Sequence, residues 1–416
     1  MDSRAPFYLP APSLAQTVLA SIPDGVLGVH RLKKLAEVSW RNAATLSLIH
    51  ENNHNLSVLF LLCDSIIEDW SYCVEHLRDI LCLALLMRNN TKINILGICD
   101  DMLDCGDLMA HFFRTLEGNN SIRKLTVLSA TLTDSSETLS NFDNLASFIK
   151  SHKPLAEIEF ASSDMPVEAW NALPRTLEEC AGRSLHLFKL SGCNIGDEQL
   201  GRIVTALSAH QQLEVLGLQL HAPHGSTNRA THLALATGLK TGFSNLKTLE
   251  LDSHLANVVE AITNGSKIEH LILHRDFFEN THEGWQVLKK LLCDTSSINK
   301  TFFSNHSVHK ISAPLVLLQV PSDIQILLDL NRLVNKNDVS KMKIVQHHSD
   351  FDLSNLFQWD LKALPLILEW LQAANNLAGD NNVRIDCSRR KLSTLYQYAR
   401  KMPSSFVTAL AIPDYL

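Results

Sequence analysis

The sequence lacks a long apolar segment, an excess of positive charge and paired cysteine motifs, and each absence excludes a class of protein. The longest apolar run, Ile80 to Met87, is far shorter than the roughly 20 residues of a membrane span. The first thirty residues show no basic start followed by a continuous apolar stretch, so no signal peptide is expected. The net charge is −7 over 416 residues, which disfavours a nucleic-acid binder, because such proteins need a basic stripe. Nine cysteines without a C-x-x-C pair indicate neither a disulfide framework nor a zinc ribbon. We therefore expect a reduced, soluble, cytoplasmic protein with no membrane or nucleic-acid partner.

The sequence does contain a degenerate repeat, in which an apolar residue is followed by two others, an apolar residue, one other and an apolar residue. Clear copies begin at Leu56, Ile93, Ile122, Leu155, Leu185, Leu213, Leu246 and Ile268. A worn ninth copy reads Ile298-x-x-Thr301-x-Phe303. Most steps between copies lie near or slightly above the period of roughly 20 to 29 residues of leucine-rich repeats.

The segments between the copies carry helical spacing. Apolar residues recur at i, i+3, i+4 and i+7 after the fifth and seventh copies, and a shorter version follows the third. The three sets are Leu200, Ile203, Val204 and Leu207; Leu255, Val258, Val259 and Ile262; and Leu145, Phe148 and Ile149. Each unit is thus predicted to be a strand followed by a helix. Stacked units would place parallel strands on a concave side and helices on a convex side.

This arrangement resembles the ribonuclease-inhibitor-like class of leucine-rich repeats, and its best copy is the segment from Leu185 to Asp197. The C-terminal part is similar to the tail of the diatom-type family of such proteins. That similarity is carried by Leu330-Asn331-Arg332, Asn335-Lys336, His347-His348, Trp359, Leu364-Pro365, Trp370, Leu392-Ser393, Tyr396 and Met402-Pro403, with Ser304-Asn305-His306, Val308 and Ile311 just after the last repeat. The resemblance implies a horseshoe with a helical end cap and no catalytic activity.

The predicted fold is therefore an α/β leucine-rich repeat solenoid, or horseshoe, with helical end caps. Residues 1–47 are predicted to form a helical N-terminal cap, with Leu14, Val18, Leu19 and Ile22 on one face. Residues 48–312 hold about nine repeats, and residues 313–416 form a helical C-terminal cap. Its first helix is expected to begin at Ser322-Asp323 and the second at about Asp338.

No motif in the chain assembles a catalytic constellation, so neither enzyme activity nor a cofactor is expected. His274-Arg275-Asp276 spells the kinase catalytic triplet, but a Gly-rich loop and an Asp-Phe-Gly partner are missing. The acidic stretch from Asp100 to Asp107 lacks calcium-loop spacing. The ninth positions of successive repeats read Cys193, His221, His254, Asp276 and His306. These types can bind metal, but replacement of the usual backbone-bonding Asn is the favoured interpretation, and no metal site is predicted.

The residues between the core positions of each strand point away from the core and are the candidate partner-binding surface. The predicted contact residues are Phe60, Lys124, Glu157, Glu159, Lys189, Glu250, His270, Ile272, Lys300 and Phe302. Apolar residues in the first repeats are equally consistent with coverage by the N-terminal cap. The predicted function is that of a monomeric, non-catalytic scaffold or adaptor that binds an unidentified protein through this face. The alternatives are a regulator of a small GTPase, a substrate receptor of a ubiquitin ligase and, remotely, an enzyme.

Overall fold

The protein is described by a computed structural model that covers residues 45–46, 48–62, 71–73, 79–99, 106–128, 136–163, 165, 167–220, 229–251, 262, 266–273, 281–313, 320–333 and 336–347. The chain divides into two compact units. Unit 1 comprises Met1–Ala261 with Leu271–Glu279, and unit 2 comprises Ile262–His270 with Asn280–Leu416. Each unit is considered by itself below.

The strands form a sheet in which every pairing with a described register is parallel. The strand order is β10-β9-β8-β7-β6-β5-β4-β3-β1-β2, so sequential repeats are neighbours except at the β2 edge. The strands are β1 Val58–Leu62, β2 Ser71–Cys73, β3 Ile95–Cys99, β4 Lys124–Leu128, β5 Glu157–Ala161, β6 Leu187–Cys193, β7 Val215–Leu220, β8 Thr248–Leu251, β9 His270–Leu273 and β10 Lys310–Ser312. The predicted α/β class with parallel strands is confirmed.

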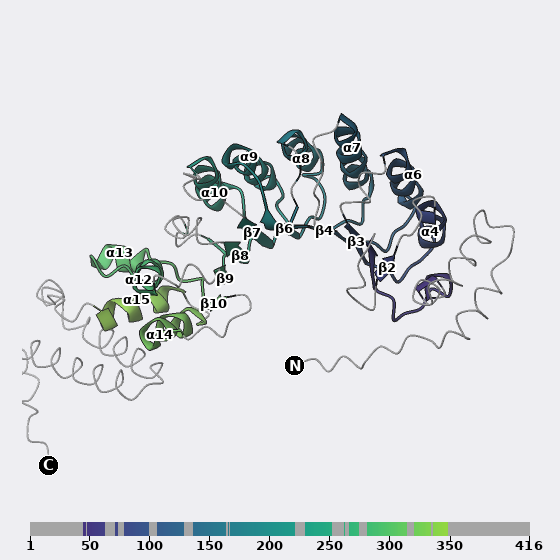
Figure 1. The fold of residues 1–416 in the computed structure, drawn as a ribbon. Helices are drawn as coiled ribbons and strands as arrows, with labels where there is room; N and C mark the ends of the chain where they lie inside the picture. Colours follow the sequence, from purple (N-terminus) through teal and green to yellow (C-terminus); the bar gives the residue numbers. More distant parts are fainter. Residues whose placement is uncertain are drawn as a thin grey trace, which may run out of the picture. The chain divides into compact units, whose positions relative to one another are not determined.

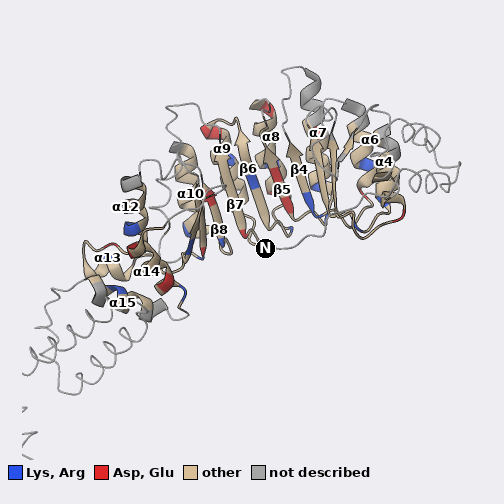
Figure 2. Cartoon of the chain, turned by 60° about the horizontal axis from the view of Figure 1, so that its bottom comes forward, with Lys and Arg blue, Asp and Glu red and all other residues tan. Residues whose placement is uncertain are grey.

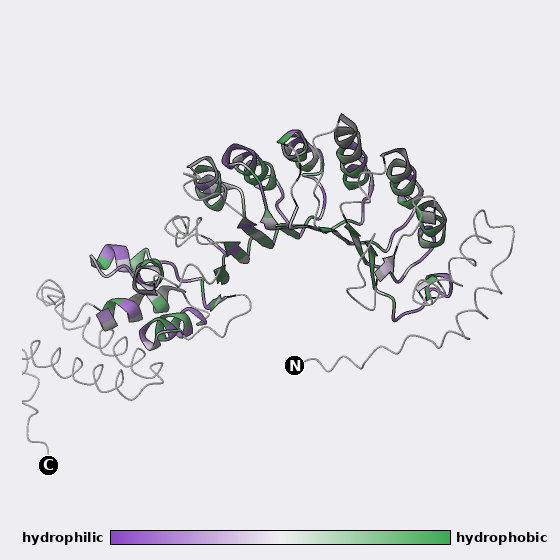
Figure 3. Cartoon of the chain, in the orientation of Figure 1, coloured by the Kyte–Doolittle hydropathy of each residue, from purple (hydrophilic) through white to green (hydrophobic). Residues whose placement is uncertain are grey.

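The helices of unit 1 alternate with these strands and lie together on one face of the sheet (Figure 1). They are α4 Asp79–Arg88, α6 Gly106–Leu116, α7 Ser136–Ser151, α8 Val167–Glu179, α9 Asp197–Leu207 and α10 Arg229–Thr241. Each helix contacts the next along the series. Figure 3 shows apolar colour on the strands and helices where the two layers meet, although polar segments also occur on the strands.

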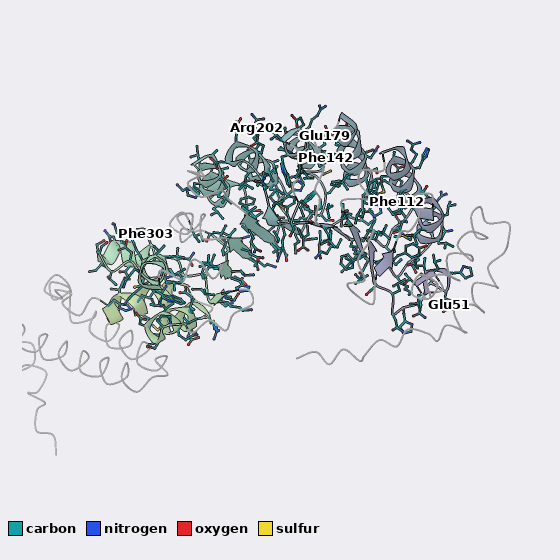
Figure 4. All side chains as sticks on the ribbon, in the orientation of Figure 1. Glu51, Phe112, Phe142, Glu179, Arg202 and Phe303 are labelled. Carbon is teal, nitrogen blue, oxygen red and sulfur yellow. The ribbon has the colours of Figure 1, made fainter. Side chains whose placement is uncertain are left out.

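The core of unit 1 is built from the repeat positions that the sequence predicted. The first, fourth and sixth residues of the copies from Leu56 to Leu251 are all buried, as are Leu271 and Leu273 of β9. Between the layers, the predicted helix residues Leu200, Ile203, Val204 and Leu207 are also buried. Phe112 and Phe142 fill the same layer, whereas Glu179 and Arg202 stand on the outer surface of the helices (Figure 4).

Buried asparagine side chains hold the turns that lead from helix to strand. The Asn119 Oδ1 accepts hydrogen bonds from the main-chain N–H groups of Ser121 and Ile122, at 2.8 and 3.0 Å. Its Nδ2 donates to the carbonyls of Met87 and Asn90, at 2.8 and 2.9 Å, which belong to the preceding repeat. A helix leaves its last carbonyls without internal partners, and Met87 lies in the last turn of α4. Asn119 thus fixes its own turn and ties it to the repeat before.

Other repeats satisfy these carbonyls in the same way with different residues. Asn90 Nδ2 donates to Ile49 O at 3.1 Å, and His210 Nε2 lies 2.9 Å from Leu177 O, in α8. His152 Nε2 lies 3.0 Å from Ile122 O, a carbonyl that precedes β4 and does not belong to a helix end. Because a carbonyl only accepts, the bonded nitrogen of each imidazole carries its proton. The side chains of Asn90, Asn119, His152 and His210, together with the carbonyls that they bond, are called the turn ladder below.

The structure corrects the predicted ninth repeat. Residues Ile298–Phe302 form a short helix, α13, not a strand. The strand of this repeat is β10, whose adjoining His309 and Lys310 N–H groups donate to Glu269 O, at 3.0 and 3.1 Å. The same pair of bonds links Asn94 and Ile95 to Ser57 O at the first repeats, so the pattern locates the true copy at Val308-x-x-Ile311. The predicted copy had the polar residue Thr301 at its fourth position. The true copy has the apolar residues Val308 and Ile311 at its first and fourth positions, and both are buried.

The helices of unit 2 lie on both sides of β10 in the chain, two before it and two after it among the described residues. They are α12 Thr281–Leu292, α13, α14 Ser322–Asn331 and α15 Lys336–His347. The predicted helix at Ser322 is confirmed, and the second begins two residues before the expected Asp338. Contacts join α12 to α14, α13 to α15 and α14 to α15.

The polar interior of unit 2 reproduces the turn ladder. Lys343, on α15, is fully buried and donates to Leu292 O at 2.6 Å and Asn305 O at 3.0 Å. These are the counterparts of the Met87 and Asn90 carbonyls that Asn119 binds. Asn331, on α14, donates to Val308 O at 2.6 Å, the counterpart of the Ile122 carbonyl that His152 binds. The two helices supply donors that a further repeat would otherwise provide.

Several predictions fall outside the described residues. They include the N-terminal cap through residue 44, the residues Leu255, Val258 and Val259 of the predicted helical stripe, and the helices predicted beyond residue 347. Ile262, the last member of that stripe, is described and buried, but it does not lie in a helix. The strand β2 was not predicted at all. It has three residues and pairs with β1 on the side away from β3, so it is too short to carry the repeat motif.

Candidate binding surface on the open sheet face

The face of the unit 1 sheet that none of the described helices covers carries two rows of side chains. Registered pairs link neighbouring strands along each row, so the rows cross the strands. Row A consists of Val58, Ile95, Lys124, Glu157, Leu187, Val215 and Thr248. Row B consists of Phe60, Gly97, Thr126, Glu159, Lys189, Gly217 and Glu250. We call the two rows together the open face.

Opposite charges on the open face are arranged in pairs. Lys124 Nζ lies 2.6 Å from Glu159 Oε2, which joins row A of β4 to row B of β5. Lys189 Nζ lies 2.8 Å from Glu250 Oε2, two strands away. Figure 2 shows the result as a red segment of β5 between blue segments of β4 and β6. Lys124, Glu159 and Lys189 stay partly exposed and Glu250 is buried, and the main effect of the two pairs is to neutralise charge on this face.

Two glycines give these side chains room to lie flat on the sheet. A Cβ on Gly217 would lie 2.9 Å from Lys189 Cγ and 3.3 Å from Glu250 Oε2, so the ion pair passes directly over this residue. A Cβ on Gly97 would overlap the ring of Phe60. Glycine at these positions therefore allows Phe60 and Lys189 to reach across the neighbouring strand.

Glu157 differs from the other charged residues of the open face. Within the part of the chain that the structure describes, its carboxylate has neither an ion-pair partner nor a hydrogen-bond donor. Its row A neighbour Lys124 turns instead to Glu159. On the other side follow Leu187 and Val215, both partly exposed. A single uncompensated negative charge thus stands at the end of a short aliphatic strip.

The structure brings together six of the ten predicted contact residues. Phe60, Lys124, Glu157, Glu159, Lys189 and Glu250 all lie on the open face. Glu250 is buried by its ion pair instead of being freely exposed. His270 and Ile272 lie on β9 as partly exposed residues, and His270 Nε2 lies 2.7 Å from the Ser312 hydroxyl.

Lys300 and Phe302 do not belong to this surface. Both lie on α13, so their assignment to a strand is wrong for the reason given above for the ninth repeat. Phe302 is exposed there and its ring meets that of Phe303 edge-on at 5.2 Å between centroids. Phe303 is labelled in Figure 4. Lys189 pairs with Glu250 and not with Glu159, its registered neighbour on β5, because Gly217 leaves room for its side chain to cross β7.

Cys193 and Cys293 are buried thiols, and the described residues hold no metal-binding cluster. Burial raises the pKa of the Cys193 thiol to about 11, and that of Cys293 to about 11 as well. Such thiols stay protonated at neutral pH and are poor nucleophiles. Among the residues described, no group of three or more His, Cys, Asp and Glu side chains is placed to hold a metal ion. Of the predicted ninth positions, His221, His254 and Asp276 fall outside these residues, and Cys193 donates to Phe160 O at 3.4 Å.

The comparisons with known proteins assign no family. No protein-family model matches the chain, and a search of curated proteins finds no match either. Of the helices that the structure describes, none has both the length and the apolar character required to cross a bilayer.

Proposed function

We propose that the chain is a leucine-rich repeat solenoid of the ribonuclease-inhibitor-like kind that serves as a protein-binding scaffold, with the open face as its contact surface. The observation that carries the proposal is the composition of that face. It combines aliphatic and aromatic side chains with paired charges on a sheet whose other face is covered by helices. Mixed polar and apolar surfaces of this kind are typical of protein interfaces.

A rigid support favours binding. The strand backbones are paired with their neighbours, and the turn ladder fixes the repeats against each other. Side chains on such a support are held in place before a partner arrives, which reduces the entropy that binding costs. Apart from Glu157, the charged side chains of the open face form ion pairs with each other and do not surround a position for a reacting group. This arrangement supports a non-catalytic role.

The test compares charge reversal on the open face with the same reversal on the helices. The face variant carries Glu157→Lys and Glu159→Lys. The control carries Asp143→Lys on α7 and Glu178→Lys on α8, two exposed residues without described ion pairs. Both variants change the net charge equally, so a general electrostatic effect would appear in both.

Proteins captured from native cells are compared by quantitative mass spectrometry, with circular dichroism and thermal unfolding measured on each variant. We expect the face variant to fold normally and to lose a set of proteins that the wild type and the control retain. Equal capture by all three folded proteins would contradict the proposal. If only the control variant lost captured proteins, the binding surface would lie on the helices and not on the open face.

A further inference from the structure

We infer that the partner surface bound by the open face is an amphipathic helix of another protein, with a Lys or Arg that meets Glu157 and aliphatic residues that meet Leu187 and Val215. The inference rests on the proposed function and specifies the chemistry of its partner. It depends on three features of the open face, namely its charge balance, its backbone hydrogen bonds and its strand spacing.

The charge balance selects a basic residue. The charges of Lys124, Glu159, Lys189 and Glu250 are compensated within the face itself. Glu157 is the row A carboxylate without a described partner, and it is partly buried. A partner that covered Glu157 with an apolar or acidic group would remove the carboxylate from water without a compensating charge, and this desolvation costs binding free energy. A cationic side chain satisfies it by a charge-assisted hydrogen bond.

The backbone hydrogen bonds select a helix over an extended segment. The N–H and C=O groups of β5, β6 and β7 are directed along the sheet at their neighbouring strands. They are therefore not available to a segment lying on the face, and strand addition works only at a sheet edge. A segment buried against the face needs partners for its own backbone, and an α-helix supplies them internally.

The strand spacing fixes the order of the contacts. Glu157, Leu187 and Val215 lie on three successive strands, which are about 4.8 Å apart. A helix laid along row A rises about 5.4 Å per turn, so successive turns meet successive strands. The cation at position i would meet Glu157, and aliphatic residues at i+3 or i+4 and at i+7 would meet Leu187 and Val215. Thr248 is the next residue of row A, so the end of the partner helix would lie beside the Thr248 hydroxyl.

The experiment uses a phage library displayed on a monomeric helical scaffold, with the full-length chain as bait. The library randomises one exposed helix face and encodes basic, acidic and aliphatic residues at equal frequency. Selected helices are synthesised, and their dissociation constants are measured against wild type, Glu157→Gln, Leu187→Ser and the helix-layer control Glu178→Gln. Thermal unfolding of each variant shows whether it is folded.

We expect enriched helices to carry Lys or Arg followed by aliphatic residues at i+3 or i+4 and i+7. Glu157→Gln should weaken their binding about tenfold, whereas Glu178→Gln should leave it unchanged. Raising the salt concentration should weaken wild-type binding and have less effect on the Glu157→Gln variant.

The outcomes separate this inference from the proposed function. Helices that lack a basic residue, or that bind Glu157→Gln as tightly as wild type but lose affinity for Leu187→Ser, would overturn the inference and leave the open face as the binding surface. Helices indifferent to both changes would count against the face as well. If the selection enriched no helices, the inference of a helical partner would be wrong. The proposed function would then be tested by the capture experiment alone.

Discussion

Replacing Asn119 with alanine tests whether the turn ladder holds consecutive repeats together. The change removes both donors and the acceptor of the amide at once. The buried Ile122 N–H then loses the acceptor that Asn119 supplies, whereas the Met87 carbonyl keeps its hydrogen bond from the Asn90 N–H at 3.0 Å. A buried polar group left unsatisfied costs roughly 1–3 kcal/mol, so the Ile122 N–H predicts a loss of about 1–3 kcal/mol in the free energy of unfolding.

The assay is equilibrium unfolding in urea, followed by circular dichroism. The matched control is Asn94→Ala, the same chemical change at an exposed position just before β3 in the preceding repeat, where the expected effect lies within about 0.5 kcal/mol. Amide hydrogen exchange should show faster exchange for Ile122 N–H in the Asn119 variant. A loss below about 1 kcal/mol would mean that water replaces the amide, and the ladder would then contribute little to stability.

Two further predictions concern other members of the same system. Burial chiefly lowers the pKa of His152 and His210 below the ordinary value of 6.5. The unfolded chain therefore binds protons more readily, and stability should fall as the pH drops below about 6.5. The double variant His152→Gln with His210→Gln should show a weaker fall between about pH 6.5 and 5 in urea titrations. Lys343→Met should destabilise unit 2 by about 1–3 kcal/mol, because the Leu292 carbonyl loses its charged donor, whereas the Asn305 carbonyl keeps a hydrogen bond from Asn331. Hydrogen exchange should then rise in α12 and α15, whereas uniform exchange across both units would contradict the assignment.

The strand positions were predictable because the repeat encodes them directly. In the copies from Leu56 to Leu251, three apolar residues at fixed spacing face the helices, and a shift of one residue would expose all of them. The same alternation predicts which residues form the open face. The prediction of a ninth strand at Ile298 was wrong because a match by residue type carries no information about the hydrogen bonds that define a strand. The Glu269 carbonyl, bonded by His309 and Lys310, identifies the register that the spacing missed.

The charge pattern of the candidate site was only partly predictable. Its members follow from alternation, but the partner of each charged side chain depends on how far that side chain reaches. Lys189 passes over Gly217 to Glu250, and Lys124 crosses from row A to row B. These paths leave Glu157 uncompensated, although both of its adjacent strands carry a lysine. Lys and Arg side chains span more than one strand spacing, so the nearest charge in register is not necessarily the partner.

The turn ladder shows a further limit on inference from sequence, because one structural task is performed by different residues. Asn119 and Lys343 donate to equivalent carbonyl pairs, yet one is an amide in a turn and the other an ammonium on a helix. Their acceptors are separated from them by 29 to 51 residues, so no local pattern connects donor and acceptor. The carbonyls of the last repeat require a buried hydrogen-bond donor at the position that the turn of a following repeat would occupy. A long side chain on α15 meets that requirement as well as another asparagine would, and it does so from an element that carries no repeat motif at all.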